Sequence, residues 1–102
     1  MERLFSIKVH SGPSDEKIVY ACDHNLLGKK VREGNMVLEV SIEMYGETTV
    51  SEEELLEILN QASSFTLVGE RVVSLAIRHK LIHPDSVLKI AGIPYAMFIA
   101  IY

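Results

Sequence analysis

The stretch SEEELLEILNQA, residues 51–62, predicts a helix in the middle of the chain. Ser51 and Glu54 form a capping box, in which the hydroxyl accepts a hydrogen bond from the amide three residues on and the glutamate accepts one from the serine amide. Apolar residues then recur at the i, i+4, i+7 spacing of one helix face: Leu55, Leu59 and Ala62. The three glutamates suit the positive end of the helix dipole, so helix initiation explains the acidic run better than a metal or substrate site does.

Upstream of this helix, apolar and polar residues alternate with the period of two that is typical of a half-buried strand. The alternation predicts strands over residues 5–10 and 38–42, and a run of strand-forming residues predicts another over 17–22. Residues 11–16 between the first two runs are dense in turn formers, so these runs are expected to form a hairpin with a longer loop.

Downstream, residues 65–68 are a short connector or strand, and a second helix begins at Gly69-Glu70. Apolar residues nearly fill the surface of that helix, which is therefore expected to pack on more than one side. It ends near Lys80, a position where glycine would better suit a left-handed helix terminus. Residues 87–90 and 95–102 are strand-like, and the second is apolar on both faces, so it is expected to be central or covered.

The resulting order is β-β-β-α-(β)-α-β-β, an α+β fold with a small mixed or mostly antiparallel sheet and two helices. The 102 residues are expected to make a single domain spanning residues 1–102. A single cysteine is compatible with a reducing, cytoplasmic setting, and the apolar end of the chain is too short to span a bilayer. We therefore expect a cytoplasmic protein that does not enter a membrane.

The residues with most chemical capability gather in Cys22–Gly34. If the strand continued through His24, Cys22 and His24 would share a face, where the imidazole could activate the thiol or both could bind a metal. Zinc needs four donors and no other histidine has a suggestive spacing, so no metal site is predicted. The alternative is a buried structural cysteine beside a solvated loop histidine. Asp23 and His24 are also candidate binding residues, next to the cationic segment that follows them.

Two segments have the composition of an anion site. Gly28, Lys29, Lys30 and Arg32 combine a flexible backbone with three cations, although the spacing of a P-loop is absent. The alternative there is a polar surface loop with solvated cations. Gly69 and Glu70 place a glycine at a helix start, where free amides could hold an anion, but the glutamate favours plain helix initiation.

Several segments together resemble an archaeal family called domain of unknown function 424. The resemblance covers almost the whole chain and rests on the order and spacing of short motifs: Ala21-Cys22-Asp23, Leu26-Leu27-Gly28-Lys29, Glu33-Gly34, Leu38-Glu39-Val40, Tyr45-Gly46-Glu47, Ser51-Glu52-Glu53-Glu54, Leu67-Val68-Gly69-Glu70, Asp85-Ser86-Val87 and Gly92-Ile93-Pro94. It implies a cytoplasmic archaeal protein and implies no reaction, cofactor or ligand.

Three hypotheses for function follow. In the first, the protein is a non-catalytic binding module that contacts RNA, a ribosomal component, another phosphate-bearing ligand or a protein through Lys29, Lys30 and Arg32. In the second, it is a small enzyme or ligand-binding protein that uses Cys22 as a reactive thiol with His24. In the third, it is a structural component that forms a homo-oligomer through its apolar C-terminal strand together with the apolar second helix. The net charge of −4 counts against a general nucleic-acid binder but not against a local cationic patch, and we favour the first hypothesis.

Overall fold

The computed structural model describes residues 4–46 and 48–100. The strands, in chain order, are β1 (Phe5–Ser11), β2 (Lys17–Asp23), β3 (Lys30–Glu33), β4 (Met36–Glu39), β5 (Thr48–Val50), β6 (Ser64–Val68), β7 (Leu88–Ile90) and β8 (Ile93–Ile99). The helices are α1 (Ile42–Tyr45), α2 (Glu52–Gln61) and α3 (Glu70–Arg78), with 3₁₀ turns η1 (His24–Leu26) and η2 (Pro84–Ser86). Within the described ranges, no helix combines the length and apolarity needed to cross a membrane. The α+β class is confirmed.

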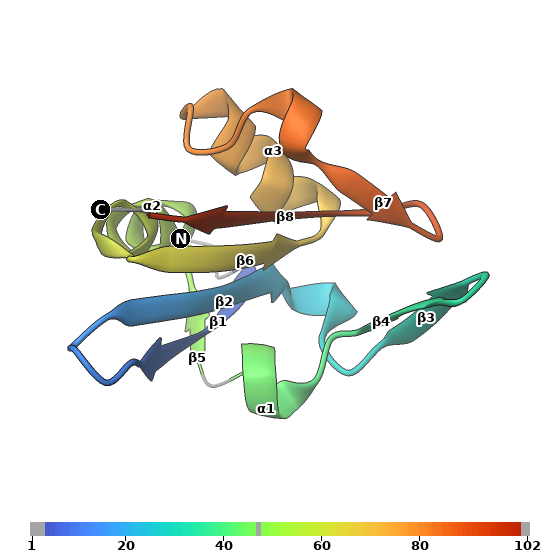
Figure 1. Cartoon of the computed structure of the whole chain (residues 1–102), viewed down its shortest axis with the longest axis horizontal. Coiled ribbons are helices and arrows are strands. Elements are labelled where there is room, and N and C mark those ends of the chain that lie inside the picture. Colours follow the sequence, from blue (N-terminus) through green and yellow to red (C-terminus); the bar gives the residue numbers. More distant parts are fainter. Residues whose placement is uncertain (1–3, 47, 101–102) are drawn as a thin grey trace.

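Six strands form one sheet in the order β5-β1-β2-β6-β8-β7, and β3 and β4 pair separately as a two-stranded ribbon. Every pairing in the large sheet is antiparallel except that between β2 and β6, which is parallel. The carboxyl ends of β2 and β6 therefore lie at the same edge of the sheet, and α3 begins there directly after β6. In Figure 1 the ribbon extends beyond the sheet on the side of β7, at the other end of the molecule from α2.

The two faces of the sheet bury separate clusters. One cluster joins sheet residues such as Phe5 and Leu67 to buried residues of α2 and α3, such as Leu55 and Val72. On the other face, Cys22 and Val68 pack with residues of the ribbon, the segment that follows it, α1 and the β7–β8 hairpin: Leu38, Val40, Tyr45 and Ile90. Helices α2 and α3 thus cover one side of the sheet, and the ribbon and α1 cover part of the other.

The predicted capping box at the start of α2 is confirmed. The amide of Glu54 donates to Oγ of Ser51 at 3.4 Å, and the amide of Ser51 donates to Oε1 of Glu54 at 3.0 Å. Leu55 and Leu59 are buried, as the periodicity predicted. The 5–10 and 17–22 strands are also confirmed and form an antiparallel hairpin.

The segment around residues 30–45 differs from the sequence expectation. The strand predicted over 38–42 ends at Glu39, because the hydroxyl of Ser41 accepts a hydrogen bond from the amide of Met44 and starts the single turn of α1. Ile42 consequently lies outside the sheet and is 61% exposed. Residues 30–33, expected to be a loop, form β3, because Gly34 adopts a positive φ of 60° and allows a tight return to β4. The predicted count of two helices therefore omitted α1, and β5 was not predicted either.

The expectations for β8 and α3 also need correction. β8 lies between β6 and β7 in the sheet, as one of the two expected alternatives has it, but β7 pairs only with Ile93–Tyr95 and side chains beyond that pairing are exposed. Met97 and Ile99 there are 58% and 68% exposed. The helix α3 is buried over much of its surface but not all round: its buried residues are Val72, Val73, Leu75 and Ala76, whereas Glu70, Arg71, Ser74 and Arg78 are exposed. The last part of the strand predicted over 95–102, Ile101 and Tyr102, lies outside the described residues.

Lys80 adopts the left-handed conformation that the sequence suggested, with φ of 59°. The amide of Leu81 donates to the carbonyl of Ala76 at 2.8 Å, which is the long hydrogen bond of a Schellman ending. Replacement of Lys80 by glycine should relieve the contact between Cβ and the backbone and raise the free energy of unfolding by about 0.5–1 kcal/mol. Urea unfolding measures the change, and Lys80→Ala is the control, since it keeps Cβ and should give no such gain. Equal stability of the two variants would contradict a strained left-handed backbone at Lys80.

Candidate functional site

The shared edge at which β2 and β6 end holds a cleft of about 370 Å³. Its lining residues come from β2, η1 and α3 and from the residue before β1: Leu4, Asp23, His24, Asn25, Glu70 and Arg71. Asp23 and His24 were candidates from one segment of the sequence, and Gly69 and Glu70 from another. The parallel β2–β6 pairing brings the two segments together.

The carboxylate of Asp23 caps the N-terminus of α3. Its Oδ2 accepts a hydrogen bond from the amide of Arg71 at 3.0 Å, and its Oδ1 accepts one from the amide of Val72 at 2.9 Å. The residue is only 6% exposed. The chain itself therefore supplies the anion at this helix terminus, and two of the amides that an external anion would use are already occupied. This arrangement disfavours the predicted anion site at Gly69 and Glu70.

Gly69 allows the carboxylate to reach the helix. It has a φ of +124°, and a Cβ placed there would lie 2.5 Å from Cγ of Asp23. Its amide donates to the carbonyl of Pro94 at 2.9 Å, which joins the helix start to β8 as well. Any side chain at position 69 would be strained by the backbone conformation and would displace the capping carboxylate.

His24 stands at the rim of the cleft on the first residue of η1. Its Nδ1 is 2.6 Å from Oγ of Ser6, a residue of β1 that is 1% exposed, and its amide donates to the carbonyl of Leu4. A hollow of about 400 Å³ adjoins the imidazole on another side, lined by Ser6, His24, Leu27, Gly46, Thr48 and Thr49. A buried hydroxyl therefore orients the ring, while the side chain itself is exposed.

Cys22 does not take part in the cleft. The residue is fully buried and packs in the cluster beneath the ribbon. Among the described residues no hydrogen bond joins its thiol to His24, whose Nδ1 bonds to Ser6 instead. Burial, and secondarily the charge of Asp23, raises the pKa of the thiol to about 12. A thiolate is disfavoured in this environment, which disfavours the hypothesis of a reactive thiol activated by a neighbouring imidazole.

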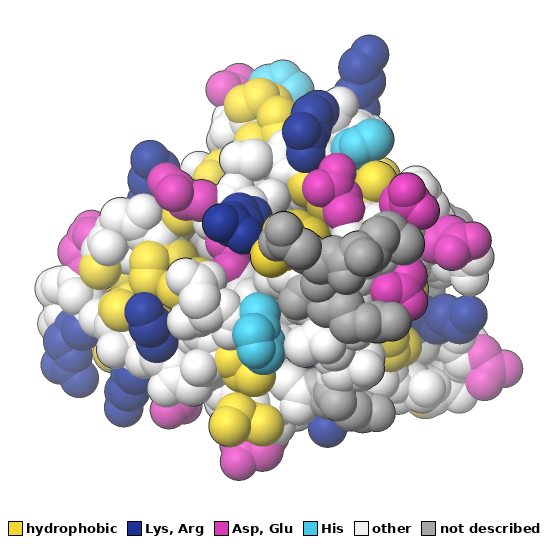
Figure 2. Space-filling view, turned by 180° about the vertical axis from the view of Figure 1, so that it is seen from behind, with side chains coloured by type: hydrophobic (Ala, Val, Ile, Leu, Met, Phe, Trp, Pro, Cys, Tyr) yellow, Lys and Arg dark blue, Asp and Glu magenta, His cyan; other side chains and the backbone are white. Residues whose placement is uncertain are grey.

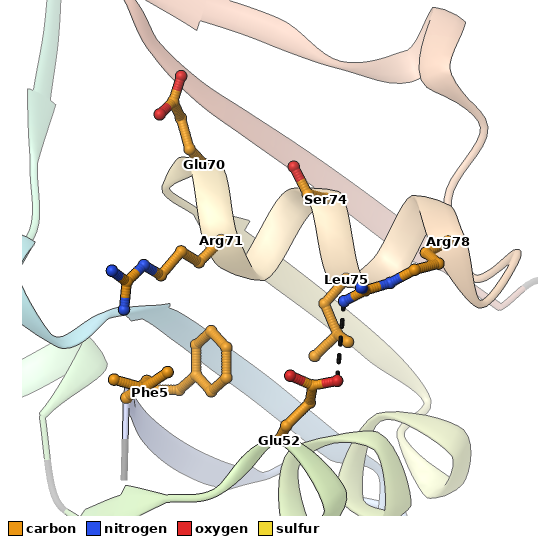
Figure 3. Close-up of a pocket in the computed structure, with 8 residues that line it drawn as sticks. Phe5, Glu52, Glu70, Arg71, Ser74, Leu75 and Arg78 are labelled. Carbon is orange, nitrogen blue, oxygen red and sulfur yellow. Dashed lines mark ion pairs between the residues drawn. The ribbon is translucent and has the colours of Figure 1, made fainter. Parts of the chain in front are cut away.

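A second hollow, of about 420 Å³, adjoins the cleft, and Leu4, Glu70 and Arg71 line both. Figure 3 shows Phe5 and Leu75 between Arg71 at one end and the Arg78–Glu52 ion pair at the other. The pair joins α3 to α2 with Nη2 and Oε1 3.7 Å apart. Figure 2 shows cations and carboxylates interspersed over one side of the molecule. Local contacts, rather than a broad field of one sign, would therefore select a ligand on that side.

The third group of candidates lies away from the cleft, on the ribbon (Figure 1). Its base is held by Gly28 and Lys29: the Gly28 amide donates to the carbonyl of Val40 at 2.7 Å, and the Val40 amide donates to the carbonyl of Lys29 at 2.8 Å. Gly28 has a φ of +88°, which suits the turn into the ribbon. The structure thus separates these residues from Asp23 and His24, which are their neighbours in the sequence.

Strand alternation divides the ribbon into two faces. Val31 packs against the core, and Oε1 of Glu33 accepts a hydrogen bond from the amide of Ala91 at 2.7 Å. Lys30 and Arg32 therefore lie on the other face and are exposed. The β3–β4 register places Lys30 opposite Glu39 and Arg32 opposite Val37, so a carboxylate stands beside one of the two cations.

The comparisons with known proteins concern the family and the fold. The sequence matches the family described as "Protein of unknown function (DUF424)" over residues 11–101. A solved structure, described as an uncharacterized conserved protein from Methanopyrus kandleri, is similar with a TM-score of 0.75 and 17% sequence identity. That match covers 96% of this chain and 94% of the other. No curated protein matches the sequence. The structural likeness supports the fold alone.

Removal of the Asp23 carboxylate should weaken the junction of β2 with α3. We expect Asp23→Ala to lower the free energy of unfolding by about 2–4 kcal/mol, because two amides lose a charged acceptor. The free energy of unfolding of Asp23→Asn should lie between the values for Asp23→Ala and the wild type, since one amide keeps a carbonyl acceptor. Urea unfolding checks the order, with exposed Asp15→Asn as a control expected to remain within about 0.5 kcal/mol of wild type. A loss for Asp23→Ala no larger than that control would refute the capping role.

Cys22 should react with iodoacetamide at pH 8 only as fast as the protein opens, because the buried thiol is protonated and inaccessible.

The raised pKa of the Cys22 thiol also has a consequence for stability. The unfolded thiol ionises near its ordinary pKa of 9.0, whereas the native thiol ionises at about 12. Between these values the native state binds the extra proton, so the free energy of unfolding should fall as pH rises from 9 to 12.

Two measurements check these expectations for the thiol. Alkylation of the wild type should accelerate in sub-denaturing urea, and rapid alkylation in the absence of urea would contradict burial. The loss of unfolding free energy between pH 9 and 12 should be smaller in Cys22→Ala. This variant keeps the parallel effect of Tyr45, because burial also raises the pKa of that side chain to about 12.

Proposed function

Because the chain belongs to the DUF424 family, whose description assigns no activity, we propose a function from its own surfaces: it is a non-catalytic binding protein that contacts the phosphates of RNA through the outward face of the β3–β4 ribbon. The observation that supports this proposal is the placement of Lys30 and Arg32 side by side on an exposed face of a ribbon whose other face is anchored.

Anchoring matters because a cation contributes most to binding when little conformational entropy is lost on contact. The ribbon is held at its base by the two hydrogen bonds with Val40 and along its side by the bond from Ala91 to Glu33. Val31 and Leu38 pack into the core beneath it. The cations therefore project from a supported strand pair, and Lys29 adds a third exposed cation at its base.

The charges of the ribbon favour a limited contact. Glu33 is bonded to Ala91, and Glu39 lies opposite Lys30, so carboxylates offset part of the charge of Lys29, Lys30 and Arg32. The chain as a whole carries a net charge of −4, which repels a polyanion outside the ribbon. These charges suit an RNA held at a few phosphates rather than a long electrostatic track.

The double variant Lys30→Gln/Arg32→Gln tests the proposal. Fluorescence anisotropy with a labelled single-stranded oligoribonucleotide, measured over a series of salt concentrations, gives the affinity and its salt dependence. We expect wild-type affinity to fall as salt rises, and the variant to bind more weakly with a slope of log affinity against log salt smaller by about 1.4, since each lost phosphate contact removes about 0.7.

The matched control is Lys17→Gln/Lys80→Gln, which removes the same charge from exposed positions outside the ribbon. It should retain most of the wild-type affinity and, in particular, bind more tightly than the ribbon variant. Equal losses in the two double variants, or an absence of wild-type binding at low salt, would overturn the proposal.

A further inference from the structure

We propose that the cleft between His24 and Arg71 and the hollow that adjoins it together bind a small organic anion, with a carboxylate or phosphate group at Arg71 and an apolar body over Phe5 and Leu75. This site lies on α3 and the ends of β1 and β2, and it is separate from the ribbon. The proposal therefore does not depend on RNA binding.

The guanidinium of Arg71 supplies the charge. Figure 3 shows its side chain on the same side of α3 as Phe5, whereas Glu70 and Ser74 extend from the opposite side. The carboxylate of Asp23 lines the same cleft, but both of its oxygens accept backbone amides of α3. No ion pair involves Arg71 among the described residues, in contrast to Arg78, which is paired with Glu52. Arg71 is therefore the cation available to a ligand, and its planar fork matches a carboxylate or phosphate.

His24 supplies a second polar contact. Its Nδ1 lies 2.6 Å from the hydroxyl of buried Ser6, which fixes the plane of the ring. When the hydroxyl donates to Nδ1, the neutral ring carries its proton on Nε2 and can donate a hydrogen bond from that atom. His24 and Arg71 line one cleft together with Asn25, whose amide is a further donor. These donor groups suit an anion. Of the two carboxylates in the same lining, Asp23 is occupied by amides of α3, and the side chain of Glu70 extends from the opposite side of α3 to Arg71 (Figure 3).

The adjoining hollow explains why the ligand should carry an apolar body. It is open between the first turn of α3 and the Arg78–Glu52 ion pair, and Leu4, Phe5 and Leu75 line it (Figure 3). Its volume of about 420 Å³ lies within the range of small-molecule sites. An inorganic anion would satisfy Arg71 but would leave this hollow unfilled. A ligand with both parts also removes its own apolar surface from water, whereas Phe5 and Leu75 are already only 2% and 1% exposed.

Titration of the full chain with phenyl phosphate, followed by ¹H–¹⁵N NMR, tests the site. We expect saturable shifts at His24, Arg71 and Leu75. Affinity should exceed that for inorganic phosphate by about tenfold, because a phenyl group buries apolar surface. Benzyl alcohol, which has the body without the charge, should bind at least tenfold more weakly than phenyl phosphate. Benzoate distinguishes the two anions: tighter binding of benzoate assigns the site to carboxylates, and tighter binding of phenyl phosphate assigns it to phosphate monoesters.

Variants distinguish binding in this cleft from binding elsewhere on the protein. Arg71→Gln should weaken binding of the preferred anion by about tenfold or more, and His24→Gln should weaken it less. Lys80→Gln removes a cation beyond the other end of α3 and should bind as wild type does. Lys30→Gln/Arg32→Gln should also bind normally, which distinguishes this cleft from the ribbon. Thermal unfolding confirms that each variant is folded. Equal affinity of Arg71→Gln and wild type, or shifts that do not saturate and are scattered over the surface, would overturn the proposal.

Discussion

The hydrogen bonds from the first turn of α3 to the Asp23 carboxylate join the start of this helix to the end of β2. Asp23 is the last residue of β2, and the two amides that it accepts lie 48 and 49 residues further along the chain. The contact requires parallel pairing of β2 with β6, so that both strands end at one edge, and a residue without Cβ at position 69. The walls of the cleft follow from it, since His24 continues from β2 and Arg71 belongs to the capped turn.

The same contact occupies the N-terminus of α3 but leaves the neighbouring cation exposed. A helix N-terminus normally attracts an anion, but here the protein's own carboxylate satisfies two amides of α3. The cation beside them, Arg71, remains exposed to the cleft. The distribution of polar groups therefore favours recognition by side chains at this edge, and the ribbon offers a second cationic surface at a different place in the molecule.

The thirteen residues Cys22–Gly34, the most chemically rich stretch of the sequence, do not form a single site. The structure places Cys22 in the core, Asp23 on α3, His24 in the cleft and the cations on the ribbon. Their closeness in sequence reflects a chain that leaves the sheet at Asp23, turns through η1 and begins a new strand pair. Sequence reasoning named most of these residues as candidates but could not foresee that they would separate. Arg71, which lines the cleft, was not a candidate, because an arginine in the first turn of an apolar helix gives no signal by itself.

Local interactions account for what the sequence by itself determined. The capping box of α2, the β1–β2 hairpin, the start of α3 and the left-handed position of Lys80 depend on residues close together in the chain, so the pattern of side chains was sufficient to predict them. Tertiary structure decided the parallel β2–β6 pairing, the capping of α3 by Asp23 and the open end of β8. These depend on which distant segments meet, and the hydrophobic pattern of a strand specifies which face is buried but not which strand lies beside it.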